Sequence, residues 1–512
     1  MRSRARVTRW NLFFEYVSIG LMIVSGILLV PLYLRFIPIG LYGAWLATGN
    51  ILAWLTAIDP GLSTVLQQQV AVAYGKKDFT AVRELFAGGL CITTAIICVI
   101  IVLSFILAKH LPGWLNLPVD IDSAMIIKAF CLMVIGTALM IFSYSITATN
   151  GGLLASVSIG IIYVIVTVFS IILTIALLYN GFGLLAIPMG CLFRGVGLIL
   201  GNFGYFIWRT AVEKIGFSFS FRKAPALIKL TLYTFLGNCG ELITNNTDLF
   251  ILSRFLGPEI VPVLHLTRTP TQMSKAFVVR PAIAFMPAVS HLVGSGEIDK
   301  ARTVLLRFSR IIFWLLGLFV SGFIVFNDDF VRLWVGSQLF AGQAINLILC
   351  GIFFFAVISD SLVKLCLALG NIKGNNLMTF IKALLFIPLV ILGAKYLGIL
   401  GIVLAQLLSI LVVSSWYYPR SFSRLLKLLP RDHKDIIREI LRIFVIIVPL
   451  MLSFVWFHPQ GWFQFIVLVV SFGILYAFGL WLISKQFRSE MILLFRWLPI
   501  KFFKIPSFEE SA

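Results

Sequence analysis

Charged residues are scarce in this chain of 512 residues: Asp, Glu, Lys and Arg make up 12% of it, whereas hydrophobic residues make up 60%. In soluble globular proteins about a quarter of the residues are charged. The mean hydropathy of +1.02 is correspondingly high. The composition therefore excludes a water-soluble globular protein and favours a chain that spans a membrane many times.

Residues that commonly bind metals or perform catalysis are also few. The five histidines have no metal-ligand spacing, and the sequence contains no glycine-rich nucleotide loop. The seven cysteines show neither a pairing pattern nor metal spacing, so we interpret them as small apolar core residues. We expect no metal, no cofactor and no catalytic residue, and we do not expect an enzyme.

Apolar runs of about 20 residues, long enough to cross a bilayer as helices, recur along the whole chain. The spans must be helical, because lipid offers no partners to backbone polar groups. We predict fourteen spans, at 10–36, 39–59, 85–108, 124–148, 153–179, 183–208, 230–256, 260–290, 306–327, 342–369, 376–396, 398–418, 440–458 and 462–484.

Basic residues are unequally distributed over the loops between these spans. One set of loops, with both termini, holds 29 of the 41 Lys and Arg residues, and the opposite set holds five. Because Lys and Arg near a membrane are retained on the cytoplasmic side, both termini are predicted to be cytoplasmic. The net charge of +20 then reflects membrane orientation, and nucleic acid is not an expected partner.

The two halves of the chain match when it is shifted by 219 residues. Gly75 then lies over Gly294 and Arg83 over Arg302, and the hydropathy pattern stays in register. Parallel repeats of this kind are related by an axis along the membrane normal, with the substrate site between them. We therefore predict an all-α integral membrane fold of two six-helix bundles plus two extra C-terminal helices. The expected domains are 1–229 for the N-terminal bundle, 230–438 for the C-terminal bundle, and 439–512 for helices 13 and 14 with a cytoplasmic tail.

Six basic residues fall deep inside predicted spans. Charges at that depth are costly, and they usually face a cavity or a partner of opposite charge. We interpret these six as the candidate substrate-binding residues of a cationic cavity: Arg194, Arg268, Lys275, Arg280, Lys364 and Lys382.

Two acidic residues of the seventh span are candidate partners for two of these cations. Glu241 and Asp248 are seven residues apart, so they share a helix face. The eighth span runs back in the opposite direction, which predicts pairs between Asp248 and Arg268 and between Glu241 and Lys275. Such a ladder either only fixes the register of the two helices or takes part in ion coupling, and the sequence leaves both open.

A third deep acid, Asp360, is expected to pair with Lys364 one helical turn away. Asp360 is the third coupling or ion-pair candidate, with the two acids of the seventh span. No obvious carboxylate partner then remains for Arg194, Arg280 and Lys382. Unpaired cations in a water-filled cavity suit an anionic ligand, especially phosphate. Snorkelling to the membrane surface or bonding to backbone carbonyls is the alternative.

The segment from residue 30 to residue 79 resembles the start of a known family. Its pattern consists of Pro31, Tyr33, Gly40, Tyr42, Gly43, Trp45, Asp59, Gly61 and Leu62, with Pro60 inserted in the last turn. By these residues the chain resembles the polysaccharide transporter or O-antigen flippase-like family. That family belongs to the multidrug/oligosaccharidyl-lipid/polysaccharide (MOP) exporter superfamily.

The resemblance implies a V-shaped fold of two bundles, inward- and outward-open states, and a central cationic cavity. It implies a flippase for an undecaprenyl-diphosphate-linked oligosaccharide, an O-antigen or exopolysaccharide repeat unit, in the bacterial inner membrane. The expected partners are this lipid-linked substrate, membrane lipids, a coupling proton or sodium ion, and other polysaccharide-assembly proteins. Helices 13 and 14 are expected to help hold the isoprenoid tail.

Two other functions remain as alternatives. A drug/cation antiporter of the same superfamily would want unpaired acids in its cavity, whereas deep cations outnumber deep acids here. A membrane glycan polymerase usually has a large outer loop with polar or catalytic residues. The longest predicted outer loop, between Ala108 and Ala124, has only about 15 residues, so the polymerase is the less favoured of the two.

Overall fold

The computed structural model describes residues 4–56, 62–117, 122–213, 224–294 and 297–497. Within these ranges the chain forms helices joined by short connections and no strand. Nine helices of this part of the chain are long and apolar enough to cross a membrane, and one of them covers two predicted spans. Each of the fourteen predicted spans coincides with helical segments, which confirms the all-α membrane fold.

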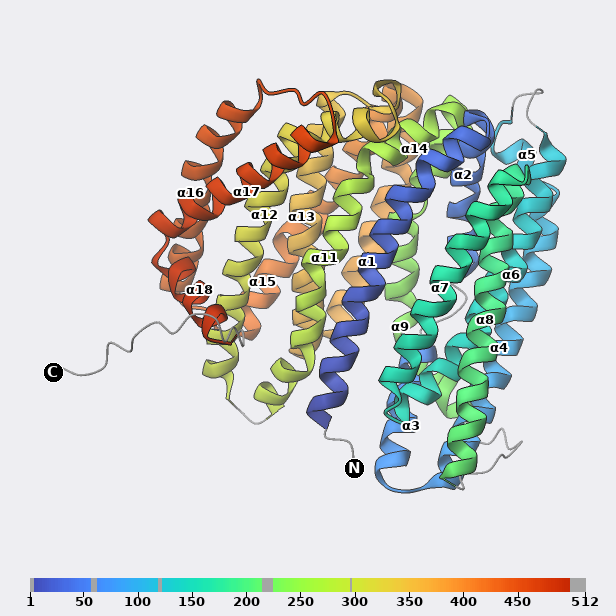
Figure 1. The fold of residues 1–512 in the computed structure, drawn as a ribbon. Helices are drawn as coiled ribbons and strands as arrows, with labels where there is room; N and C mark the ends of the chain where they lie inside the picture. Colours follow the sequence, from blue (N-terminus) through green and yellow to red (C-terminus); the bar gives the residue numbers. More distant parts are fainter. Residues whose placement is uncertain (1–3, 57–61, 118–121, 214–223, 295–296, 498–512) are drawn as a thin grey trace.

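The first part of the chain builds one group of helices (Figure 1). Its elements are α1 (Arg4–Phe36), α2 (Ile39–Thr56), α3 (Leu62–Gly75), α4 (Phe79–Ala108), α5 (Leu111–Trp114), α6 (Ser123–Gly152), α7 (Ser156–Tyr179), η1 (Gly183–Leu185) and α8 (Ala186–Val212). Helices α3, α4, α6, α7 and α8 pack against one another, and α1 contacts both this group and the second one. Helix α3 was not predicted as a separate element, and the turn motif at 59–61 lies outside the described residues.

The second part of the chain builds the other group. Its elements are α9 (Ala224–Asn245), α10 (Asp248–Leu256), η2 (Pro258–Ile260), α11 (Val261–Gly294), α12 (Ile298–Val335), η3 (Ser337–Leu339), α13 (Gln343–Ala368), α14 (Ile372–Ser409), the π-helical turn η4 (Ile410–Ser414) and α15 (Ser415–Leu425). The appended elements are α16 (Pro430–Phe454), α17 (Trp462–Ile483) and α18 (Lys485–Trp497). The domain boundaries at 229 and 438 stay a prediction.

The predicted seventh span is broken into α9 and α10. At the break, the side chain of Asn246 donates to the carbonyl oxygen of Leu242 at 3.1 Å. The hydroxyl of Thr247 donates to the carbonyl oxygen of Ile243 at 2.6 Å. Asn and Thr side chains that bond to nearby backbone compete with continuous helix. The break changes the direction of the chain just before Asp248.

Helix α14 contains two predicted spans in a single element. The reversal lies at Gly398, whose φ of +59° is in the left-handed region that favours glycine. Gly393 and Gly401, on either side of the reversal, are in backbone contact, so a Cβ atom on either one would collide with the backbone of the other. The two limbs of α14 therefore approach each other more closely than side chains would allow.

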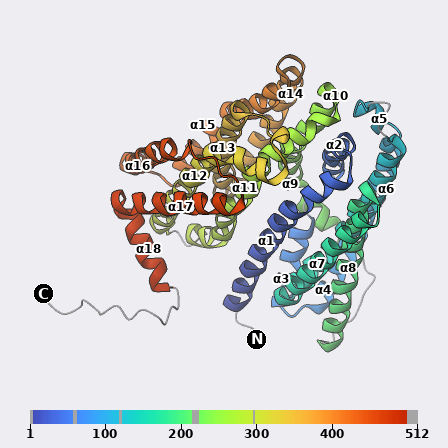
Figure 2. The ribbon, with the colours of Figure 1, turned by 45° about the horizontal axis from the view of Figure 1, so that its top comes forward.

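The two groups of helices meet where α1, α2, α3 and α4 of the first contact α9, α10, η2, α11 and α12 of the second, and Figures 1 and 2 show the two groups side by side. The hydroxyl of Ser253 donates to the carbonyl oxygen of Leu115 at 2.9 Å, and the Trp334 indole N–H donates to that of Ile27 at 2.7 Å. Each bond joins an element of one group to an element of the other. These two bonds lie toward the end of the molecule where α2 begins, and a further contact joins Gly88 of α4 to Ala224 at the start of α9.

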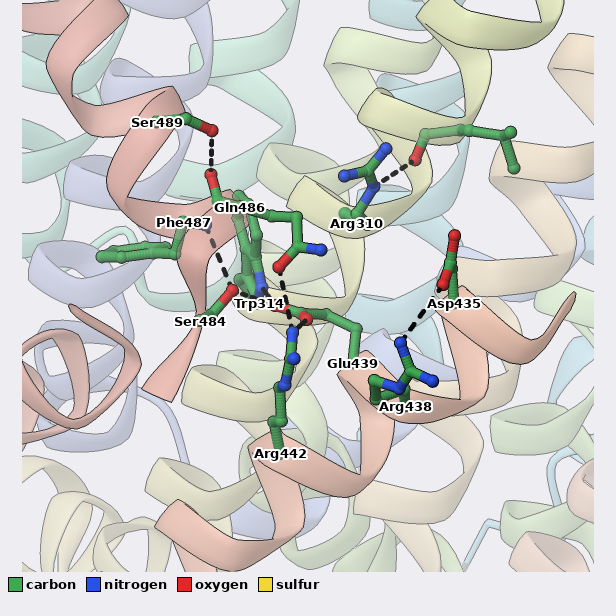
Figure 3. A network of polar contacts seen from close by, with 11 residues as sticks. Arg310, Trp314, Asp435, Arg438, Glu439, Arg442, Ser484, Gln486, Phe487 and Ser489 are labelled. Atoms are coloured by element: carbon green, nitrogen blue, oxygen red, sulfur yellow. Dashed lines mark hydrogen bonds and ion pairs between the residues drawn. The ribbon is translucent and has the colours of Figure 1, made fainter. Parts of the chain in front are cut away.

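The appended helices are fastened to α12 by a polar network around Glu439 (Figure 3). The Glu439 side chain, 1% exposed, accepts hydrogen bonds from the Trp314 indole at 2.8 Å, from Arg442 at 2.8 Å and from Ser484. Arg442 also donates to Gln486 at 2.9 Å. A buried carboxylate with several donors and a cation is stable in the interior. We therefore assign this Glu439 network a structural role, which is to hold α16 and the end of α17 against α12.

Candidate functional site

A polar cavity of about 460 Å³ lies inside the second group of helices. It is enclosed by α9, α11, α13, α14, η4 and α15, and is called the cationic cavity below. Its polar and charged lining consists of Glu241, Thr244, Asn245, Arg268, Thr271, Gln272, Lys275, Arg280, Ser359, Asp360, Lys364, Thr379, Lys382, Gln406, Ser414 and Tyr418. Five of the six predicted cations therefore reach one cavity.

Helix α11 provides three of these cations, Arg268, Lys275 and Arg280. Arg268, Gln272 and Lys275 follow one another at intervals of four and three residues, which places their side chains on the same side of the helix. Arg280 continues this lining at the far end of the cavity. The spacing recognised in the sequence thus corresponds to a real face of the helix.

The centre of the cavity is an ion pair between two helices. The Lys275 ammonium lies 2.7 Å from a carboxylate oxygen of Asp360, and the two side chains are 30% and 26% exposed. Asp360 also interacts electrostatically with Lys364 and Lys382. Glu241 interacts in the same way with Lys275 and Lys382. Three lysines and two carboxylates therefore share one partly open space.

A second ion pair closes one end of the cavity. Arg268 and Asp248 are directly bonded, and their side chains are 7% and 3% exposed. The Asn50 amide of α2 donates to the other oxygen of Asp248 at 3.5 Å, across the interface between the two groups. The predicted pair of Arg268 and Asp248 is confirmed, and its burial indicates that it neutralises itself.

The other two predicted pairs were wrong in their partners. Lys275 binds Asp360 and not Glu241, although Glu241 lies nearby. Asp360 in turn binds Lys275 of the neighbouring helix and not Lys364 of its own. The break after α9 removes the continuous face that Glu241 and Asp248 were expected to share, so the two acids do not extend one ladder.

Lys382 and Arg194 also depart from the prediction. Lys382 was expected to have no carboxylate near it, but it lies within electrostatic reach of Asp360 and Glu241. Arg194, on α8, is not in the lining of the cationic cavity. Its guanidinium donates to the Tyr163 hydroxyl at 2.7 Å and lies 5.0 Å from the centre of the Tyr163 ring. A guanidinium over an aromatic face is a favourable arrangement for a cation in an apolar setting.

The charge of the cationic cavity is positive on balance. Arg268 is neutralised by its partner, and Arg280 has a further interaction. Even without these two arginines, the three lysines exceed the two carboxylates among the described lining residues. Cations that surround a solvated space bind phosphate and similar oxyanions through charge-assisted hydrogen bonds.

Within the described residues, no three His, Cys, Asp or Glu side chains come together in a way that could hold a metal ion. Sequence reasoning missed the uncharged polar lining of the cavity, such as Gln272, Asn245 and Tyr418. Their types are common on any helix, and only the fold shows that they point into the same space.

The fold is similar to that of several solved membrane transporters and of a lipid flippase. The lipid II flippase MurJ in an inward closed conformation aligns with a TM-score of 0.64 at 15% identity, over 94% of this chain and 100% of that one. A multidrug resistance MATE family transporter of the MOP superfamily, in its inward-facing conformation, aligns with a TM-score of 0.60 at 14% identity, over 79% and 98%. A multidrug resistance MATE family transporter of the MOP superfamily in an outward-facing conformation aligns with a TM-score of 0.55 at 15% identity, over 82% of this chain and 95% of that one. These likenesses show that the chain shares the multi-pass helical fold of these proteins.

The chain belongs to the polysaccharide biosynthesis protein family, whose model matches residues 40–341. This confirms the resemblance recognised in the first spans. Among curated proteins, none matches the sequence.

Proposed function

We propose that the protein is a flippase that moves an undecaprenyl-diphosphate-linked oligosaccharide across the bacterial inner membrane by alternating access. The cargo class is an O-antigen or exopolysaccharide repeat unit. The single observation that carries this proposal is the convergence of Lys275, Lys364 and Lys382, with Arg280, on one cavity inside the membrane-spanning part of the fold. A diphosphate diester has one negative charge on each phosphate and matches such a site.

The polar and the apolar parts of the substrate need different surroundings, and the structure offers a cavity suited to each. The diphosphate and the glycan need a shielded polar route, because polar groups are costly in hydrocarbon, whereas the isoprenoid tail can stay in lipid. An apolar cavity of about 360 Å³ lies on another side of α11, between α1, α12 and α17. Met273 of α11, Phe319 of α12 and Phe465 of α17 are in its lining. We assign this cavity to the tail, with α11 between tail and headgroup.

Alternating access requires that contacts between the two groups of helices break. With the predicted cytoplasmic termini, the bonds of Ser253 to Leu115 and of Asn50 to Asp248 lie toward the outer side. Their presence supports an arrangement closed on the outside. Opening outward would separate Asn50 from Asp248 and leave the Asp248 pair with Arg268 within the second group.

Glu241 and Asp360 are the coupling groups we favour. Substrate phosphates compete with these carboxylates for Lys275 and Lys382, and a displaced carboxylate can take up a proton. Asp248 is bonded to a buried arginine, so we assign it a structural role. Glu241→Gln is expected to change the dependence of transport on pH. Unaltered transport with an unaltered pH profile would contradict this coupling role.

Deletion of the gene tests the proposed function. We expect lipid-linked oligosaccharide to accumulate on the cytoplasmic leaflet and the surface glycan to be lost, with restoration by the wild-type gene. Lys434→Met, which changes an exposed cation of α16, serves as the control and should restore both as well. Normal surface glycan together with lost resistance to dyes or drugs would indicate the antiporter instead.

A further inference from the structure

A second cavity, of about 520 Å³, lies in the first group of helices. It is formed by α1, α3, α6 and α7, and Arg280 of α11 completes its wall. It is called the neutral cavity below. Because Arg280 lines both cavities, the neutral cavity and the cationic cavity adjoin at this residue.

The lining of the neutral cavity differs in kind from that of the cationic cavity. Among the described residues that line it, Arg280 is the one charged side chain, and there is no carboxylate. The polar groups are hydroxyls and an amide, including those of Ser18, Gln67 and Thr147. No hydrogen bond of the Gln67 or Thr147 side chain to protein occurs within the described part of the chain. Their donors and acceptors are therefore available to a ligand.

Two tyrosines add aromatic surface to this lining, Tyr144 and Tyr163. Hydroxyl and amide groups beside aromatic rings suit a sugar, which offers hydroxyls at its edge and C–H groups on its faces. Arg194 holds Tyr163 from outside the cavity, by the 2.7 Å bond to its hydroxyl and by the position over its ring. Arg194 is thus a positioning residue for this wall.

We propose that the neutral cavity binds the sugar that is bonded directly to the diphosphate. This inference rests on the proposed function, because it places the diphosphate in the cationic cavity. The first sugar is covalently attached to the second phosphate and must lie next to it. The two cavities adjoin at Arg280, so the bond between the second phosphate and the first sugar is placed beside this residue. The two groups of helices then divide the headgroup between them, with the anion on one side and the uncharged ring on the other.

Binding of two probes to the purified full-length protein tests this assignment. The probes are undecaprenyl diphosphate and undecaprenyl diphosphate that bears one N-acetylglucosamine. The wild type should bind the sugar-bearing probe about tenfold more tightly, as expected from one or two added hydrogen bonds. Gln67→Ala/Thr147→Val should lose this increment and keep the affinity for undecaprenyl diphosphate. Thr94→Val, at an exposed residue of α4 that bonds its own helix, should keep both affinities.

The positioning role of Arg194 has its own readout. Arg194→Met and Tyr163→Phe should each reduce the sugar-dependent increment while the affinity for undecaprenyl diphosphate stays unchanged. A merely structural role would lower both affinities together. Lys382→Met should lower both affinities and keep their ratio, because it acts on the diphosphate alone.

The outcomes separate the two proposals. Equal affinity of the wild type for both probes overturns the sugar site and leaves the diphosphate site intact. An increment that survives Gln67→Ala/Thr147→Val also overturns it. Failure of the wild type to bind either probe overturns the proposed function, and the sugar assignment falls with it.

Discussion

Two clusters of charged residues in this molecule show how differently buried charge can be used. In the Glu439 network, one carboxylate that is 1% exposed accepts bonds from an indole, a hydroxyl and a guanidinium. In the cationic cavity, the Lys275 and Asp360 side chains are 30% and 26% exposed, and further cations surround the pair. In the Glu439 network, protein groups supply the hydrogen-bond donors and the charge partner of the carboxylate. The second cluster has positive charge left for a ligand, so exposure and charge balance, more than depth, mark a binding site.

Removal of one cavity cation should give the largest effect. Lys382→Met keeps the stem of the side chain and removes its charge. We expect transport of lipid-linked oligosaccharide in reconstituted vesicles to fall by about 10- to 100-fold, since a charge-assisted hydrogen bond contributes about 1.5–3 kcal/mol. The melting temperature should hold or rise slightly, because a costly charge has left the interior. Transport unchanged per folded molecule, with a lower melting temperature, would assign Lys382 to structure instead.

Loss of the Glu439 carboxylate should give the opposite pattern. Glu439→Ala removes the acceptor of the Trp314 indole and leaves Arg442 with Gln486 but without its buried carboxylate partner, and we expect a loss of about 3–5 kcal/mol of stability. Transport per folded molecule should stay near that of the wild type. Thermal unfolding in detergent measures the first, and vesicle assays measure the second. Glu439→Gln, which retains an acceptor oxygen, is the matched control and should lose less. A selective loss of transport with normal unfolding would remove the distinction between the two clusters.

The smallest effect is expected at Asp432, near the start of α16 and outside the predicted spans. Burial by itself would raise the pKa of Asp432, but the Leu429 amide and the Arg302 and Arg431 guanidinium groups outweigh it and lower the pKa. The carboxylate lies 2.6 Å from Arg302 of α12. Its stabilisation is therefore complete well above about pH 4, the ordinary Asp value, and is lost as the pH falls through the lowered pKa.

Asp432→Asn checks this dependence. At neutral pH the free energy of unfolding of the variant should be about 1 kcal/mol lower than that of the wild type. The difference should shrink as the medium is acidified, because the wild-type carboxylate becomes protonated. A difference that stays constant from neutral pH to pH 3 would mean that the ion pair between α12 and α16 contributes nothing to stability.

Much of the fold could be predicted from the sequence because lipid restricts the possibilities. Apolar length locates the helices, and the seven-residue spacing of Arg268 and Lys275 identifies one face of α11. The pair of Asp248 and Arg268 followed from the short turn between consecutive helices, where neighbours along the chain are neighbours in space.

The parts that could not be predicted depend on the rotation and packing of helices. Lys275 pairs with Asp360, 85 residues away along the chain, and no local spacing links the two. Arg194 looked like the other deep cations, yet it lies over Tyr163 on a neighbouring helix. Gln67 belongs to α3, which the span pattern did not reveal, so the neutral cavity had no signal in the sequence.

The contact between Gly393 and Gly401 has a consequence for the size of cargo that the protein can accept. The limb of α14 before Gly398 holds Lys382, the limb after it holds Gln406, and both side chains form the wall of the cationic cavity. The distance between these two limbs is set by the direct backbone contact of Gly393 and Gly401, which have no side chains. A methyl group at either glycine would push the two limbs of α14 apart and so move the wall of the cationic cavity that they form. Headgroup tolerance can therefore be altered from a point that no ligand touches.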